Sequence, residues 1–406
     1  MRFSPLLAAY LNVAFNVCCI RSFATESTAR KKLGKKSFIQ KQEHGIAADI
    51  LTPNEIRELA AKNAARKCGS NSQLRSWRHW IGLTISSIRC NLSENLPVPA
   101  DKARFENLFF RLGVAADNGE MPSFKDPGAR SGYALEFFCR ARNLADLFFD
   151  TLNPAYIFPD FWFDAMMETP MLGGEPRQNG RPYEVVSLGG GPAFDFVGCA
   201  LTATYCANGS AEISPIHATV FDYEDGWSDL VSSMNTSTRK MLQYSQLSCE
   251  WGGKCDITKP LSHSSNMALF QMKTADMIVC QYCVAENSKR LQESNFIFFS
   301  DLFETCADGT LFILTETTPR VWPDFYNIVE KHCGYMQIAF NKNGRQMLLR
   351  KDKPNDVSKS QNNITISSRD ADLLIDFQAI ATNHKKKVES GYERQEQKDR
   401  GQYILT

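Results

Sequence analysis

The chain has 406 residues, of which 43% are hydrophobic and 11% aromatic, so it is a globular protein long enough for more than one domain. Its 46 basic and 45 acidic residues nearly cancel, so bulk charge gives no argument for nucleic-acid binding. No run reaches the ~18–20 uninterrupted apolar residues of a membrane span, and we expect no stable span. The 13 cysteines are an odd number without a paired framework, which indicates reduced thiols.

Residues 1–45 have the composition of a targeting leader followed by a basic linker. Met1–Thr25 contains no acidic residue, and Arg21-Ser22-Phe23-Ala24 resembles a mitochondrial cleavage context. We therefore expect a transit peptide and a mitochondrial protein. Two alternatives stay open: a secretory signal with Leu6–Ala14 as its apolar region, and an uncleaved arm on a cytoplasmic protein.

The segment 46–175 is predicted to be a helical N-terminal region. Apolar residues near the 3.6-residue period and helix-forming composition predict helices at Glu55–Lys67, Leu74–Ser87, Ala100–Leu112 and Ser131–Leu152. Within the second of these, the stretch 75–80 interleaves basic and aromatic side chains, a pattern that suits stacking on RNA bases. An amphipathic helix with Trp77 and Trp80 in the core explains the same pattern, and we favour it.

From residue 176 to 350, strand and helix signals alternate, which predicts parallel βαβ units. The predicted strands are Glu184–Leu188, Ala218–Phe221, Glu250–Cys255, Met277–Cys280, Thr310–Thr315, Tyr335–Phe340 and Gln346–Leu349. Asn343-Gly344 between the last two is a hairpin signal. The fold class is therefore α/β, with a doubly wound, mostly parallel seven-stranded sheet that ends in an antiparallel hairpin. Residues 351–406 form a polar, partly disordered tail with a short helix over Ala371–Ala381.

A glycine loop follows the first predicted strand. Gly189, Gly190 and Gly191 come directly after Glu184–Leu188 and before an apolar helical pattern. Glycine allows a tight turn and close approach of a ligand to the backbone, so this strand–loop–helix unit is typical of nucleotide-like ligand sites. Tight turns also use glycine for structural reasons alone, and the prediction therefore depends on the groups that follow the next strands.

Polar side chains follow the next three strands. Asp222 at the tip of the second strand is suited to accept hydrogen bonds from the hydroxyls of a ribose. Asp256 after the third is suited to an exocyclic amino group such as that of adenine, and Gln281 follows the fourth. Each acid is equally suited to cap the turn or helix that comes after it. Because ligands bind at the carboxyl edge of open α/β sheets, we expect these groups to share one crevice with the glycine loop.

These motifs, in this order, resemble those of the class I S-adenosylmethionine-dependent methyltransferases. The resemblance covers residues 183–349, with 186–192 similar to the first motif and Asp308–Leu314 to the fifth strand. It implies a Rossmann-like domain that binds S-adenosylmethionine, with the ligand close to the backbone of Gly189–Gly191, Asp222 at the ribose, Asp256 near the adenine, and Gln281 toward the methionine part and the substrate. The N-terminal helices would then form a substrate-facing cap.

The sequence departs from the family pattern in three places. Ser187 stands where the family usually has an acid, two residues before the first glycine. The interval from Gly189 to Asp222 is longer than the usual ~20 residues, which places an insertion at Ala207–Pro215. The fourth motif lacks the Asn/Asp-Pro-Pro-aromatic signature of amino-group methylation on bases.

Methyl transfer needs positioning and a dry pocket more than it needs a catalytic triad. His263, Tyr282 and Glu286 are the candidates for a general base, and core packing or a surface position is the alternative for each. Cys280 and Cys283 form a lone CxxC without partner ligands, so we predict no metal site. The methyl acceptor stays open among RNA, protein and small molecules.

Two other functions fit part of the pattern. A nicotinamide or flavin oxidoreductase would use the same glycine loop, but the third glycine of G-x-G-x-x-G is missing. A non-catalytic methyltransferase-like scaffold that binds RNA or protein would explain Ser187 in place of the acid. We expect an S-adenosylmethionine-dependent methyltransferase.

Overall fold

The structure is a computed structural model that describes residues 72–118, 120, 123–151, 158–172, 180–207, 214–270, 272, 274–332, 335–341, 343–351 and 363–403. The targeting leader, the helix at Glu55–Lys67, the border between residues 175 and 176 and the centre of the insertion at Ala207–Pro215 lie outside the described residues. Mitochondrial import therefore stays a prediction.

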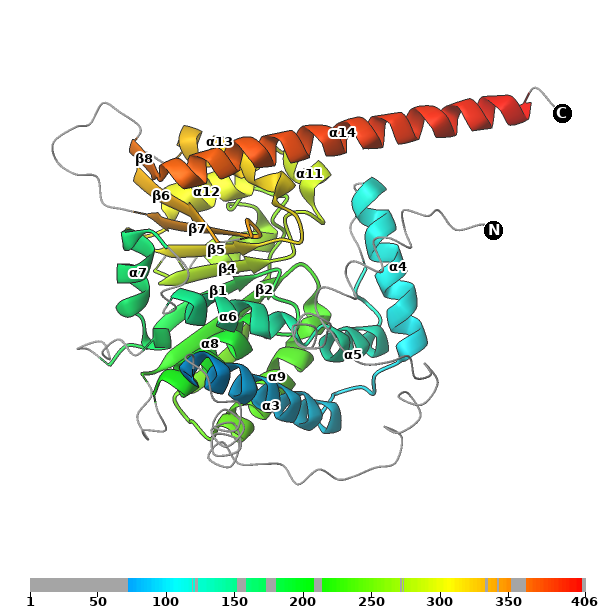
Figure 1. The fold of residues 1–406 in the computed structure, drawn as a ribbon. Helices are drawn as coiled ribbons and strands as arrows, with labels where there is room; N and C mark the ends of the chain where they lie inside the picture. Colours follow the sequence, from blue (N-terminus) through cyan, green and yellow to red (C-terminus); the bar gives the residue numbers. More distant parts are fainter. Residues whose placement is uncertain are drawn as a thin grey trace, which may run out of the picture.

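One open sheet forms the middle layer (Figure 1). Its eight strands have the order β3-β2-β1-β4-β5-β7-β6-β8, and β1 to β5 are parallel. β7 runs antiparallel to β5 and to β6, which confirms the predicted hairpin. The bounds are Tyr183–Leu188 (β1), Ile216–Asp222 (β2), Leu247–Lys254 (β3), Met277–Gln281 (β4), Leu311–Thr315 (β5), Tyr335–Phe340 (β6), Gln346–Lys351 (β7) and Asn363–Ile366 (β8). The first seven confirm the predicted strands, and β8 adds an eighth beside β6.

Helices cover both faces of the sheet (Figure 1). Side chains alternate along a strand, so Val185 belongs to one core cluster and Val186 to the other. The first cluster includes side chains of α3 (Ser72–Glu94), α4 (Lys102–Asn118), α5 (Pro127–Glu136), α6 (Arg140–Thr151), α7 (Asp160–Met167), α8 (Phe194–Cys206) and α9 (Ser228–Leu242). The second includes those of α10 (Met267–Phe270), α11 (Ser288–Glu293), α12 (Ile297–Thr305), α13 (Trp322–His332) and α14 (Ser368–Tyr403).

The N-terminal helices share the first core with the sheet. Trp77 and Trp80 are each 1% exposed, and the Trp77 ring stacks on Phe149 at a centroid distance of 4.7 Å. The Trp77 indole N–H donates to Asp146 at 3.3 Å. These rings are therefore part of the core, as the amphipathic-helix interpretation predicts, and they present no stacking surface to RNA.

Two helix predictions need correction. The single helix predicted over Ser131–Leu152 is broken between α5 and α6, because α5 ends at Glu136 and its C-cap Phe137 has a φ of −96° and a ψ of 13°, outside the helical range. The short helix predicted at Ala371–Ala381 is part of the 36-residue α14. A capping arrangement starts α14: the Ser367 hydroxyl accepts the Asp370 backbone N–H and donates to the Asp370 carboxylate at 2.7 Å.

α14 is long, but its composition is polar and charged. Within the part of the chain that the structure describes, no helix combines the length and the apolar character that crossing a bilayer requires.

Candidate functional site

A cavity lies at the point where the strand order reverses. β1 and β4 are neighbours, but the chain continues from β1 to β2 on one side and from β4 to β5 on the other, so the connections after these two strands diverge and open a crevice at their carboxyl ends. The cavity encloses about 780 Å³ of space that atoms do not fill, part of it open to solvent. All six residues predicted to bind the cofactor line it: Gly189, Gly190, Gly191, Asp222, Asp256 and Gln281. The structure thus brings together the groups that the sequence assigned to one crevice.

The glycine loop is shaped by contacts that exclude a side chain. Gly189 and Gly191 have φ values of 59° and 46°, in the left-handed region that favours glycine. A Cβ on Gly190 would lie 2.1 Å from the Ser187 hydroxyl and 3.0 Å from Val220 Cγ1. A Cβ on Gly189 would lie 2.5 Å from Cys283 Sγ. The loop therefore packs against β2 and against the loop after β4, and its backbone forms part of the cavity wall.

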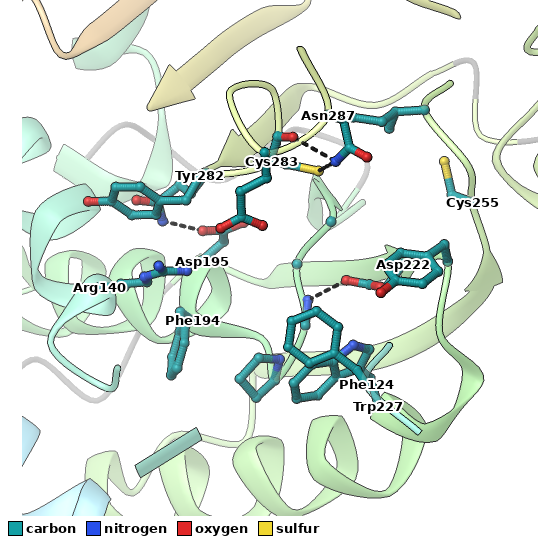
Figure 2. Close-up of a pocket in the computed structure, with 18 of the residues that line it drawn as sticks. Phe124, Arg140, Phe194, Asp195, Asp222, Trp227, Cys255, Tyr282, Cys283 and Asn287 are labelled. Carbon is teal, nitrogen blue, oxygen red and sulfur yellow. Dashed lines mark hydrogen bonds between the residues drawn. The ribbon is translucent and has the colours of Figure 1, made fainter. Parts of the chain in front are cut away.

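Asp222 ends β2 beside this loop and is 6% exposed. Its Oδ2 accepts the Gly191 backbone N–H at 3.1 Å (Figure 2). Its Oδ1 accepts the Glu224 N–H at 3.2 Å. Burial raises the pKa of Asp222 to about 7, against the opposing effect of these two bonds. The capping and the ligand-binding interpretations are both compatible with this geometry, because a carboxylate has about four acceptor positions.

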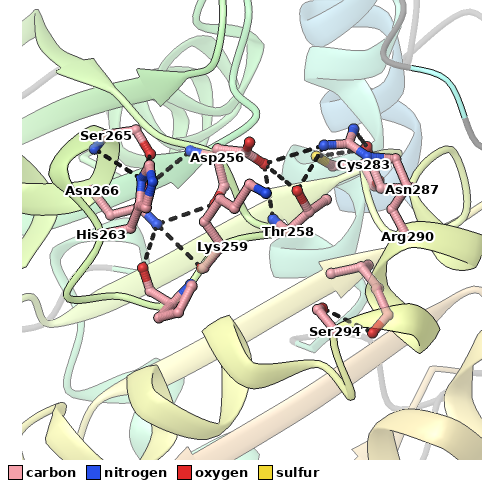
Figure 3. Close-up of polar contacts among 12 residues, drawn as sticks. Asp256, Thr258, Lys259, His263, Ser265, Asn266, Cys283, Asn287, Arg290 and Ser294 are labelled. Atoms are coloured by element: carbon pink, nitrogen blue, oxygen red, sulfur yellow. Dashed lines mark hydrogen bonds and ion pairs between the residues drawn. The ribbon is translucent and has the colours of Figure 1, made fainter.

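Asp256 belongs to a polar network beyond β3 (Figure 3). Its Oδ1 accepts the Thr258 backbone N–H at 3.0 Å and the Thr258 hydroxyl at 2.6 Å, and lies 3.7 Å from the Arg290 guanidinium. The fully buried Asn266 holds the same loop, because its amide donates to three backbone carbonyls and accepts the Asp256 N–H at 2.8 Å. This network fixes the Asp256 carboxylate at the edge of the cavity.

A third carboxylate, which the sequence analysis missed, lies at the other side of the cavity. Asp195 is in the first turn of α8 and is 2% exposed. It accepts hydrogen bonds from the Ser187 hydroxyl and from the Gln281 side-chain amide. Ser187 stands where the family has an acid. Its hydrogen bond therefore fixes the carboxylate of Asp195, which comes from α8. Burial raises the pKa of Asp195, and the two hydrogen bonds and the charge of Arg140 oppose this shift.

Arg140, the first residue of α6, is the second group that sequence reasoning missed. Its guanidinium carbon lies 4.3 Å from the centroid of the Tyr282 ring and 4.4 Å from that of Phe137. Tyr282 has a φ of 60°, and its hydroxyl accepts a hydrogen bond from the Asn143 amide at 2.5 Å. Figure 2 shows Arg140, Asp195 and Tyr282 gathered on one side of the cavity, across from Asp222. The break between α5 and α6 places Arg140 there.

The three candidates for a general base have different surroundings. Tyr282 and Glu286 line the cavity. Burial raises the pKa of Glu286, and the charge of Arg140 opposes the shift. His263 does not line the cavity: it is exposed, and its ring nitrogen accepts the Ser265 N–H at 3.3 Å as a cap of the short 3₁₀ turn Ser264–Asn266.

Buried polar atoms in the cavity wall suit a polar ligand. The Gln281 side-chain oxygen, the Trp227 indole nitrogen and the Tyr223 hydroxyl have no hydrogen-bond partner among the described residues, and all three residues line the cavity. An unsatisfied buried polar group costs about 1–3 kcal/mol. A ligand with both donors and acceptors would satisfy these atoms, and S-adenosylmethionine has both.

No family model matches the chain, and no curated protein sequence matches it. Among solved structures, a TehB-like S-adenosylmethionine-dependent methyltransferase from Corynebacterium glutamicum is 10% identical over 63% of this chain and 100% of its own, with a TM-score of 0.31. A methyltransferase from Methanosarcina mazei is 13% identical over 43% and 75%, with a TM-score of 0.25. Human N-acetylserotonin methyltransferase, solved with S-adenosylmethionine, is 12% identical over 70% and 71%, with a TM-score of 0.26.

These low identities and TM-scores carry no argument about the activity or the acceptor. The sheet itself defines the class: five parallel strands wound in both directions from β1, closed by the antiparallel β6–β7 hairpin. The chain has the class I S-adenosylmethionine-dependent methyltransferase fold.

Proposed function

We propose that the protein binds S-adenosylmethionine in this cavity and transfers its methyl group to an acceptor. One observation carries the proposal: the glycine loop, Asp222, Asp256 and Gln281, which come from four separate segments, line a single cavity at the switch point of the sheet. The acceptor stays open among RNA, protein and small molecules.

The residues of the chain have distinct tasks in this proposal. Asp222 binds the ribose hydroxyls, Asp256 lies toward the adenine, and the glycine loop lets the ligand approach the backbone. The sulfonium supplies a methyl group for an in-line displacement, so the protein contributes position and a pocket from which water is excluded. Phe124, Tyr133 and Trp227, whose rings lie within 5.6 Å of one another by centroid, provide an apolar wall.

Glu286 is the proposed proton acceptor for a nucleophile that must lose a proton. It lines the cavity, and burial raises its pKa, which makes its carboxylate a stronger base than an exposed one. The loop that carries it is held by Glu316, which is 2% exposed and accepts the backbone N–H groups of Val284 and Ala285 at 2.7 and 3.0 Å. This gives Glu286 a defined place beside the ligand.

The structure weakens the main sequence argument for a non-catalytic scaffold. That argument is the serine at position 187. Because the Ser187 hydroxyl donates to Asp195, which itself lines the cavity, a carboxylate is present at this place although the usual position lacks one.

Calorimetric titration with S-adenosylmethionine and S-adenosylhomocysteine tests the proposal. We expect saturable binding of both, and about a 100-fold loss of affinity in Asp222→Ala, since hydrogen bonds to a charged group contribute about 1.5–3 kcal/mol each. Asp225→Ala is the matched control, because Asp225 is three residues away, pairs with Lys254 at 2.8 Å and does not line the cavity. A folded protein that binds neither ligand at millimolar concentration would contradict the proposal.

A further inference from the structure

Exposed lysines surround the mouth of the cavity. Three of them, which we call the lysine rim, lie one or two residues from side chains that line the cavity: Lys125, Lys259 and Lys289. Each comes from a different segment, before α5, after β3 and in α11. Lys125 and Lys259 form no ion pair with another described residue, so their charges are open to a ligand.

Acids around the same mouth already have cationic partners. Their N···O distances are 2.9 Å for Asp126 and Arg104, 2.8 Å for Asp225 and Lys254, and 3.7 Å for Asp256 and Arg290. The rim therefore keeps a local positive potential, although the whole chain has a net charge of only +1.

Positive charge continues along the carboxyl edge of the sheet to α14. Arg320 lies in the 3₁₀ turn Pro319–Val321 after β5, and its guanidinium hydrogen-bonds to the ring of His384 in α14. The next three residues, 385–387, are exposed lysines, and the helix continues beyond the sheet (Figure 1). Adjacent strands are about 4.8 Å apart, so the edge from β3 to β5 alone spans roughly 20 Å. Cations spread over this length match a chain of phosphates better than a single anion.

The surroundings of these cations favour RNA over other polyanions. The cavity inside the rim has an apolar wall of aromatic rings, which suits a planar base, and single-stranded RNA presents its bases unpaired. A membrane surface would need an apolar face beside the basic residues. Ile375 of α14 is 69% exposed, but it lies between Asp372 and Asp376, which an anionic membrane would repel.

We propose that the methyl acceptor is single-stranded RNA, whose phosphates lie on the lysine rim and along the edge toward α14 while one nucleotide enters the cavity. This inference rests on the proposed function. In the transfer, the bond between the methyl carbon and sulfur breaks, and its electron pair stays on sulfur to give S-adenosylhomocysteine. The methyl carbon bonds to a nitrogen or oxygen of the nucleotide, and the proton of that atom goes to the Glu286 carboxylate.

The salt dependence of RNA binding counts the phosphate contacts. The probe is a fluorescently labelled pool of random single-stranded RNA of about 12 nucleotides, titrated with the full chain and followed by anisotropy. The logarithm of the binding constant falls with the logarithm of salt concentration by about 0.7 for each neutralised phosphate of a single strand. Lys125→Ala/Lys259→Ala should therefore make this slope shallower by about 1.4, or two contacts at about 0.7 each, between about 50 and 200 mM salt.

Lys240→Ala/Lys331→Ala is the matched control. Both lysines are exposed, and they lie in the last turns of α9 and α13, at the amino edge of the sheet. This variant removes the same charge from the chain, so the slope should stay as in the unaltered protein.

Transfer of a tritiated methyl group from S-adenosylmethionine to the same RNA distinguishes an acceptor from a polymer that only binds. We expect label in the RNA. In Lys125→Ala/Lys259→Ala, the KM for RNA should rise about tenfold near 150 mM salt, as two lost phosphate contacts require. The kcat should change little, because the rim does not touch the reacting atoms.

Other outcomes overturn the inference in distinguishable ways. An unchanged salt slope in Lys125→Ala/Lys259→Ala would remove the rim as an RNA surface. Lysine-dependent binding of anionic vesicles or of polyglutamate, without binding of RNA, would assign the rim to a membrane or to an acidic protein. RNA that binds through the rim but acquires no label, while S-adenosylhomocysteine binds, would not be the acceptor. Failure of both adenosyl ligands to bind, with the salt slopes as expected, would instead contradict the proposed function.

Discussion

Strand ends position one side of the cavity, and the first turns of two helices position the other. On the proposed adenosyl side, Asp222 is the last residue of β2 and Asp256 lies two residues after β3, so the ends of two strands place both carboxylates. On the opposite side, Arg140 and Asp195 come from the first turns of α6 and α8. Their positions depend on how these two helices pack on each other. Strand ends therefore position one side of the cavity, and the packing of α6 on α8 positions the other.

The largest expected effect comes from Gly190→Ala, because Gly190 lies where the two sides meet. The new methyl group would come within 2.1 Å of the Ser187 hydroxyl and 3.0 Å of Val220. It must displace Ser187, which holds Asp195, and it must press on β2 just before Asp222. We expect a loss of about 1–3 kcal/mol in the free energy of unfolding, typical of overpacking, and loss of measurable S-adenosylhomocysteine binding. Urea unfolding and calorimetry measure the two effects.

Gly82→Ala is the control for Gly190→Ala. Gly82 is in α3, and a Cβ there meets nothing within 4 Å. Alanine should therefore stabilise the helix by about 0.5–1 kcal/mol and leave binding unchanged. If Gly190→Ala instead binds and unfolds like the unaltered protein, the glycine loop does not have the packing that joins the two sides.

The same contrast between the two sides explains which parts of the fold and of the cavity the sequence predicts. Apolar runs between turn signals located β1 to β7 to within a few residues, and the groups at strand tips followed from them. Arg140 could not be found this way, because a continuous apolar period over 131–152 conceals the break after Phe137 that directs the guanidinium into the cavity. Asp195 was visible in the sequence as an acid in a first helical turn. Its bond to Ser187 depends on the tertiary fold.

A change of pH should have an intermediate effect on stability and binding, because it changes the protonation of Asp222. Burial raises its pKa from 3.8 to about 7, so the folded free protein holds a proton that the unfolded chain releases at lower pH. This group therefore lowers the free energy of unfolding as pH rises from 3.8 to about 7. Ribose hydroxyls donate to the ionised carboxylate, so binding should tighten as pH rises through this range, by up to about tenfold per unit, and should release a proton.

Calorimetry of S-adenosylhomocysteine binding in buffers of different ionisation enthalpy measures that proton. Asp195 and Glu286 also have raised pKa values, so the difference between the unaltered protein and Asp222→Asn isolates the contribution of Asp222. The variant should bind more weakly with a flatter pH profile, and its stability should fall less between pH 3.8 and about 7. Identical pH profiles in the two proteins would show that Asp222 is not at the ribose.

The smallest expected effect concerns Ala193, which connects the glycine loop to α8 and hence to Asp195. Ala193 has a φ of 70° and is fully buried. Ala193→Gly relieves about 1–2 kcal/mol of left-handed strain, loses about 0.8 kcal/mol of methyl burial and loses about 0.5–1 kcal/mol to the greater freedom of the unfolded chain. These effects nearly cancel, so urea unfolding should change by less than about 1 kcal/mol. Binding should not change, because Ala193 does not line the cavity.

Gly191→Ala is the reciprocal variant. It acquires the strain of a left-handed backbone at a φ of 46° without a clash, since the nearest ring atoms of Trp227 would be 3.7 Å away. A larger loss in Ala193→Gly than in Gly191→Ala would mean that methyl packing, and not backbone strain, governs this connection.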